Sequence, residues 1–132
     1  MISNPAKRIL SLSKSWVGKV HAFKLLKVAF PPAKKWFQKF KLRVDLGYLG
    51  IDKEDECKEL MLPHKKPPKA ELSAEQKRAN KELASERISV EHSIGGLKRY
   101  RILSDRLRCH DANFYDQVLG VCAGLWNFYL FA

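Results

Sequence analysis

The stretch from Ser73 to Lys98, SAEQKRANKELASERISVEHSIGGLK, decides the fold of this chain. Its first four residues match a capping box, in which the Ser and Gln side chains satisfy free amides at the start of a helix. Two adjacent glycines, Gly95 and Gly96, weaken a helix by about 1 kcal/mol each relative to Ala and indicate close packing or the close approach of a ligand backbone. We therefore expect a long helix that begins at Ser73, and its apolar residues at helical spacing are Leu83, Ile88, Val90, Ile94 and Leu97.

Three charged residues share one stripe of this helix. At 100° per residue, Glu91 lies about 40° from Arg87, and Lys98 lies about 20° short of two full turns from Glu91. The stripe places a carboxylate between two cations. On spacing alone, a solvated ion pair four residues apart is the preferred interpretation, so the stripe by itself does not establish a functional site.

The elements outside this helix predict a mixed α/β domain. Short strands are expected at residues 8–13, 41–45 and 58–62, and a helix at residues 20–29. Pro32 can open another short helix, carrying Trp36 and Phe37. A last helix from Asp111 to Leu130 is apolar around most of its circumference, so it must lie against a sheet or a partner. Three strands are few for such helices, which indicates an incomplete sheet.

Asp45 stands where the predicted strand 41–45 gives way to a loop containing Gly47. In α/β folds, functional carboxylates commonly follow the carboxyl ends of strands. An Asp ahead of a glycine also forms turns without any further role. Local context alone therefore leaves both interpretations of Asp45 open.

Positive charge is concentrated in the first third of the chain. Residues 1–44 contain eleven Lys or Arg and no Asp or Glu, whereas the other fourteen basic residues are balanced by fourteen acids. Such a field attracts polyanions, chiefly nucleic acid, through their phosphates. A basic surface of the ribosomal type, or one that only aids solubility, is the alternative.

The cysteines and the apolar segments favour a cytoplasmic protein without a membrane span. Cys57, Cys109 and Cys122 form no paired motif and are expected to be reduced thiols. His64, Cys109 and His110 lack the spacing of zinc ligands. The apolar C-terminal run is shorter than the roughly 20 residues that a bilayer requires.

Taken in order, several segments resemble insertion-sequence transposases of the DDE type, closest to the DDE superfamily endonuclease branch related to Harbinger elements. The pattern Arg87-x3-Glu91-x6-Lys98 resembles that family's third-acid signature, with Ala84 where a Tyr is usual. Residues 44–51, VDLGYLGI, are similar to its second-acid motif, and residues 62–67, LPHKKP, to the basic segment between the two. Residues 17–26, VGKVHAFKLL, resemble the preceding turn and helix, with Ala22 where an Asp is usual.

The resemblance implies a ribonuclease-H-like fold in which three carboxylates hold divalent metal ions, with Mg²⁺ as the expected cofactor. Asp45 would be the second acid and Glu91 the third, both catalytic and both metal ligands. Lys98 would hold a DNA phosphate, and Arg87 would orient Glu91 or contact the DNA backbone. The expected partner is DNA at transposon ends.

The family's first Asp has no counterpart, because no acidic residue precedes Asp45. We therefore expect residues 1–132 to be the C-terminal part of a catalytic domain, an incomplete ribonuclease-H-like fold without its first strands and the N-terminal DNA-binding region. Strand 41–45 would then have an open edge. Three hypotheses follow: a remnant inactive alone, a half active only when fused or assembled with an upstream half, or a non-enzymatic basic DNA-binding protein. Besides DNA, the expected partner is that upstream half or a second copy of the chain in a homo-oligomer.

Overall fold

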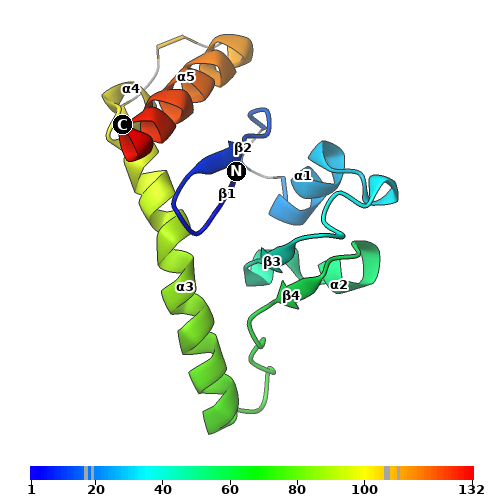
Figure 1. The fold of residues 1–132 in the computed structure, drawn as a ribbon. Helices are drawn as coiled ribbons and strands as arrows, with labels where there is room; N and C mark the ends of the chain where they lie inside the picture. The colour runs from blue at the N-terminus through cyan, green and yellow to red at the C-terminus, as the bar shows by residue number, and fades with distance from the viewer. Residues whose placement is uncertain (17, 19, 106–107, 110) are drawn as a thin grey trace. The chain divides into compact units, whose positions relative to one another are not determined.

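The computed structural model describes residues 1–16, 18, 20–105, 108–109 and 111–132. They form two compact units, the first built from residues 1–16 and 87–132 and the second from residues 17–86. Figure 1 shows the elements along the chain. Three residues singled out in the sequence, Val17, Lys19 and His110, lie outside the described part, so the segment that begins at Val17 is described only in part.

Helix α3 (Ala74–Lys98) is the long helix expected from the sequence, and its capping box is confirmed. The backbone amide of Gln76 donates to Ser73 Oγ at 3.2 Å, and the Ser73 amide donates to Gln76 Oε1 at 3.0 Å. Just upstream, the side chain of Asn80 exchanges two hydrogen bonds with the backbone of His64, at 2.8 and 3.0 Å. This exchange ties the basic segment after Leu62 to the first turns of α3.

In the first unit, strands β1 (Ile2–Ser3) and β2 (Ile9–Ser11) pair antiparallel. Lys7, in the connecting turn, has a φ of 67°, a left-handed conformation that is uncommon for a residue with a side chain. Its carbonyl accepts hydrogen bonds from Ser93 Oγ at 2.8 Å and from Trp126 Nε1 at 3.0 Å. These two donors from α3 and α5 hold the turn in place.

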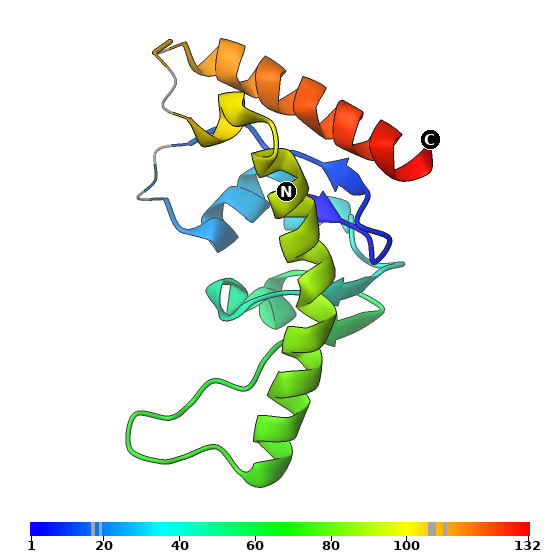
Figure 2. The ribbon, with the colours of Figure 1, turned by 90° about the vertical axis from the view of Figure 1, so that its left-hand side faces the viewer.

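Helix α5 (Ala112–Phe131) begins as the sequence predicted, because the Asp111 side chain accepts from the Asn113 amide at 2.9 Å. The short helix α4 (Arg101–Ser104) precedes it. Figure 2 shows α5 lying across the C-terminal end of α3. The core of the first unit consists of Ile9, Leu97, Cys122, Ala123 and Trp126, so one side of α5 is buried. Cover around most of the helix, as its apolar circumference led us to expect, is not found among the described residues: Phe114, Val121, Leu125 and Tyr129 are exposed.

Gly96 lets α5 approach α3 closely. A β-carbon at Gly96 would stand 2.5 Å from the indole of Trp126, which is far inside van der Waals contact, whereas a β-carbon at Gly95 would meet nothing. The expectation that the glycine pair marks close packing is therefore confirmed for Gly96. Gly95 has no such contact.

The second unit begins with α1 (Ala22–Ala29) and continues through the 3-10 helix η1 (Pro32–Lys34). Strand β3 (Lys41–Arg43) pairs in parallel with β4 (Glu59–Met61), so that Leu42 faces Leu60. Between these strands lie the 3-10 helix η2 (Leu46–Tyr48) and the single-turn helix α2 (Ile51–Glu54). The predicted helix and both predicted strands are confirmed, although each strand is shorter than expected.

The buried residues of the second unit are Phe23, Phe37, Ile51 and Asp55. Gly50, with a φ of 96°, makes the turn between η2 and α2, and a β-carbon there would lie 3.8 Å from the Phe23 ring. Lys27 places its Nζ 4.4 Å from the centroid of the same ring and pairs with Glu54 at 2.6 Å.

One expectation for this unit was wrong. Trp36 and Phe37 do not lie on the helix opened by Pro32, because Lys35 adopts a left-handed conformation with a φ of 49° and ends η1. Both aromatic residues lie in the turns that follow. In the described ranges no helix is long and apolar enough to cross a membrane.

Candidate active site

Asp45 lies two residues after Arg43, the last residue of β3, and serves as the N-cap of η2. Its Oδ1 accepts a hydrogen bond from the Leu46 amide at 2.7 Å, and its carbonyl accepts from the Tyr48 amide at 2.9 Å. The residue is exposed. The turn-forming role and the strand-end position that the sequence offered as alternatives are therefore both present.

Tyr48 interacts electrostatically with the carboxylate of Asp45. Burial raises the pKa of the Tyr48 phenol, and the negative charge of Asp45 raises it further. Both effects favour the neutral phenol. The neutral phenol can donate or accept a hydrogen bond.

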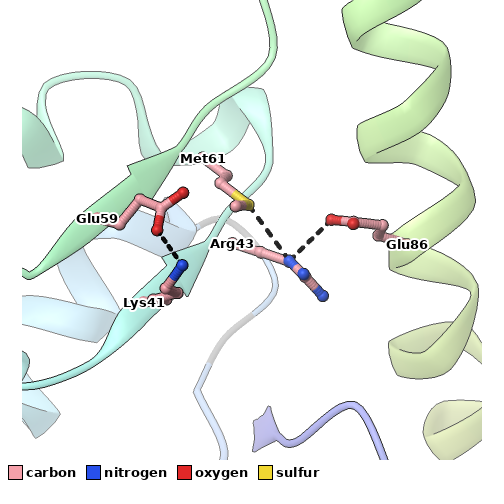
Figure 3. Close-up of polar contacts among 5 residues, drawn as sticks. All are labelled: Lys41, Arg43, Glu59, Met61 and Glu86. Atoms are coloured by element: carbon pink, nitrogen blue, oxygen red, sulfur yellow. Dashed lines mark hydrogen bonds and ion pairs between the residues drawn. The ribbon is translucent and has the colours of Figure 1, made fainter.

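The strand that leads to Asp45 is joined to helix α3 by an ion pair within the second unit. Arg43 Nε lies 2.8 Å from Glu86 Oε2 and 3.3 Å from the Met61 sulfur on β4. Figure 3 shows the Arg43 side chain extending from β3 towards Glu86 on the helix. Lys41 and Glu59, directly opposite each other in the parallel ladder, form a second ion pair.

Sequence reasoning missed the Arg43–Glu86 pair. Lys41 and Arg43 alternate with Leu42 and Val44 along the strand, and both are exposed. No local spacing joins residues 43 and 86, so only the tertiary structure identifies the partner.

Glu91 and Arg87 lie on α3, in the first unit. Arg87 Nη2 lies 3.8 Å from Glu91 Oε1, near the upper limit for an ion pair, and the Glu91 side chain is 64% exposed. The two charges therefore face each other along the helix as the spacing predicted. A loosely paired, exposed carboxylate is accessible to a ligand at little cost.

Lys98 is the last residue of α3 and is exposed. Among the residues described, it has no ion-pair partner. A cation in the last turn is stabilised by the helix dipole. Its ammonium group is therefore available to an anion such as a phosphate.

The four predicted site residues fall in different units. Asp45 belongs to the second, whereas Arg87, Glu91 and Lys98 belong to the first. The association of the two acids in one site stays a prediction.

The two acids fit a hard divalent cation in donor type, because carboxylate oxygens are the preferred protein ligands of such ions. In number they are fewer than the three of the DDE pattern. No group of three or more His, Cys, Asp or Glu side chains suited to a metal occurs within the described ranges. The zinc candidates His64 and Cys109 accordingly form no such group.

Comparisons with known proteins cover nearly the whole chain. The family of DDE superfamily endonucleases matches residues 1–127. A curated relative from Microchaete diplosiphon, described as a probable transposase for insertion sequence element IS702, is 36% identical over 113 residues. That match covers 86% of this chain and 39% of the relative. No solved structure matches significantly. With the match over residues 1–127, this chain belongs to the family of DDE superfamily endonucleases.

Proposed function

We propose that this chain contributes Asp45 and Glu91 to the active site of a transposase that cuts DNA at transposon ends and joins those ends to a target. The observation that carries the proposal is the family match over residues 1–127, a range that contains both Asp45 and Glu91. Transposases of this family act on DNA ends. The activity of a whole transposase is a proposal for this chain, because the chain spans 39% of the length of its curated relative.

Asp45 and Glu91 act as ligands of a divalent ion. Endonucleases of this superfamily generally depend on divalent metals, and Mg²⁺ is the ion we propose. When bound, the ion supplies charge stabilisation for the oxygens that enter and leave the phosphorus. The Leu46 amide supports the position of Asp45, since it holds Oδ1 at 2.7 Å.

Arg87 and Lys98 hold the DNA and orient the acid. Arg87 restrains Glu91 from one turn away on the same helix, at 3.8 Å. Lys98 binds a phosphate of the transposon end, and its exposure and lack of a partner among the described residues support this role. A lysine acts here as a point charge that does not read the base sequence.

A third acid must complete the site, and we propose that the chain is inactive without it. Residues 1–44 contain no acidic side chain that can take this role. An upstream transposase half is the proposed source, because a second copy of the chain also has no acidic residue before Asp45. The proposed fold is ribonuclease-H-like. In the described ranges β3 pairs with β4 alone, and its other edge is the place for a further strand.

Metal binding tests the proposed ligands without requiring activity. Mn²⁺ binding to the purified chain is measured by electron paramagnetic resonance for Asp45→Asn and Glu91→Gln. Each substitution is expected to weaken binding by about tenfold or more. Asp52→Asn and Glu82→Gln are the controls, because both residues are exposed acids. Asp52 lies in the same unit as Asp45, and Glu82 lies on the same helix as Glu91. Equal binding by all four variants would contradict the assignment.

Cleavage tests the need for a third acid. The chain is incubated with Mg²⁺ and DNA that carries the transposon ends. The reaction is run with the chain alone and with an added upstream transposase half, a protein whose β-strand carries the missing Asp. Nicking is expected only in the mixture, and only with Asp45 and Glu91 intact. Robust nicking by the chain alone would overturn the proposal that it is inactive by itself.

A non-enzymatic DNA-binding role is the second candidate, and the charge distribution favours it. Lys24, Lys34 and Lys39 are exposed and form no ion pair with any described residue. Such a protein would act in the cytoplasm, bound to the nucleoid. The test is DNA binding that falls steeply with salt while Asp45→Asn and Glu91→Gln leave it unchanged.

A further inference from the structure

Residues 34–40, KKWFQKF, form a turn in the second unit that the proposed active site does not use. We call this segment the basic-aromatic turn. Two large aromatic side chains are exposed there, Trp36 at 46% and Phe40 at 60%. Phe37, between them in sequence, is buried at 6% and anchors the turn. The turn is closed by the Phe40 amide, which donates to the Phe37 carbonyl at 2.9 Å.

The Trp36 ring is held by its neighbours. Phe30 meets it edge to face, with 5.8 Å between ring centroids, and Phe30 also contacts the buried Phe37 at 5.4 Å. An aromatic ring held by other rings loses little conformational freedom when a ligand stacks on it. Trp36 is therefore an exposed and preorganised platform.

Three lysines flank Trp36 in the sequence, at positions 34, 35 and 39. Lys34 Nζ lies 5.8 Å from the Trp36 ring centroid. Lys35 pairs with Glu56 at 2.9 Å, whereas Lys34 and Lys39 form no ion pair with any described residue. No acidic residue occurs in residues 1–44, so the charge of the turn is not cancelled by its sequence neighbours. The complementary ligand is a polyanion with planar apolar groups.

We propose that the basic-aromatic turn binds single-stranded DNA, with an unpaired base stacked on Trp36 and adjacent phosphates held by Lys34 and Lys39. Exposed aromatic rings alternating with cations are the usual means of holding single strands, because every base has a face that can stack. In a duplex the base faces are already stacked on each other. The turn therefore distinguishes unpaired from paired DNA. This inference deepens the proposed action on DNA ends and rests on it for biological context.

Binding of a fluorescein-labelled oligothymidylate to the full chain, followed by anisotropy, tests the stacking. Trp36→Leu is expected to weaken binding by about tenfold or more, while Trp36→Phe retains most of it because a ring remains. Trp16→Leu is the matched control, since Trp16 is 50% exposed and lies in the other unit. Binding to a duplex of equal length should change little in any of the three variants.

The phosphate contacts are tested by salt dependence. Lys34→Gln combined with Lys39→Gln should lower the slope of log affinity against log salt by about 1.4, from about 0.7 for each phosphate contact on a single strand. Lys53→Gln, an exposed cation on α2, is the control and should leave the slope nearly unchanged.

Two outcomes would overturn the inference. In one, Trp36→Leu and Trp16→Leu bind oligothymidylate equally well. In the other, Trp36→Leu abolishes self-association in sedimentation but leaves DNA binding intact, which assigns the turn to a protein contact. Asp45→Asn and Glu91→Gln should not affect oligothymidylate binding. Failure of the proposed active site, seen in Mn²⁺ binding, is thereby distinguished from failure of the basic-aromatic turn.

Discussion

Arg43 and Glu86 form an ion pair, with 2.8 Å between Nε and Oε2, although 43 positions separate them in the chain. The pair connects the strand that precedes Asp45 to the helix whose later turns carry Glu91. It lies wholly within the second unit. It ties β3 to the middle of α3.

A double-mutant cycle with Arg43→Gln and Glu86→Gln measures this coupling. Because the two side chains are 37% and 43% exposed, solvent screens the pair, and we expect a coupling free energy of about 0.2–1 kcal/mol in urea denaturation. The coupling should shrink at high salt. Lys77 and Glu71, which are 57% and 75% exposed, form the control pair and should couple more weakly. A coupling no larger than that of the control would contradict a structural role.

Gly96→Ala should destabilise the first unit, because the added β-carbon would stand 2.5 Å from the Trp126 ring. Overpacking of this kind costs about 1–3 kcal/mol. Gly95→Ala is the matched control, since its β-carbon meets nothing and alanine favours the helix by up to about 1 kcal/mol. The two variants should shift the thermal midpoint in opposite directions. Equal shifts would mean that α5 does not pack on Gly96.

Asn127→Ala should loosen the N-terminal strand pair. The Asn127 side chain accepts from the Ile9 amide at 2.8 Å and donates to the Ile9 carbonyl at 2.9 Å, in place of a neighbouring strand. Loss of both bonds should cost about 1–3 kcal/mol and speed hydrogen exchange at Ile9. Gln117→Ala, on an exposed part of the same helix, should have little effect. Unchanged exchange at Ile9 would refute the contact.

Asp55→Asn should stabilise the second unit near neutral pH. Asp55 is 7% exposed, and its Oδ2 has no partner among the described residues. Burial raises the pKa of Asp55 above its ordinary 3.8, and Glu54 raises it further, while Lys27 partly opposes them. The unfolded chain therefore releases this proton at a lower pH than the folded chain. Stability falls as pH rises from 3.8 to the raised pKa and stays reduced above it.

Urea midpoints measured between about pH 4 and pH 7 check this dependence. The urea midpoint of Asp55→Asn should exceed that of the unmodified chain most at the upper end of this pH range, and the difference should vanish as pH approaches 3.8. Asp52→Asn, an exposed neighbour on α2, is the control and should follow the unmodified chain. An advantage that does not vary with pH would rule out Asp55 ionisation as its cause.

Local chemistry made the helix starts predictable. The Ser73–Gln76 capping box and the Asp111 cap each join residues no more than three positions apart, so the sequence contains both partners of each hydrogen bond. Helix α1 and strands β3 and β4 followed from periodicity and proline positions in the same way. The left-handed Lys35 that ends η1 was not predictable, because lysine has no intrinsic preference for that conformation.

The sequence by itself indicated the family, the long helices α3 and α5 and the two acidic motifs, because these depend on residue order and local spacing. The tertiary structure decided which distant groups meet. Nothing local distinguishes Gly96 from Gly95, yet only Gly96 lies under Trp126. Arg43 likewise had fourteen possible acidic partners in the chain, and folding selected Glu86. Such choices depend on the path of the whole backbone, which no short stretch of sequence contains.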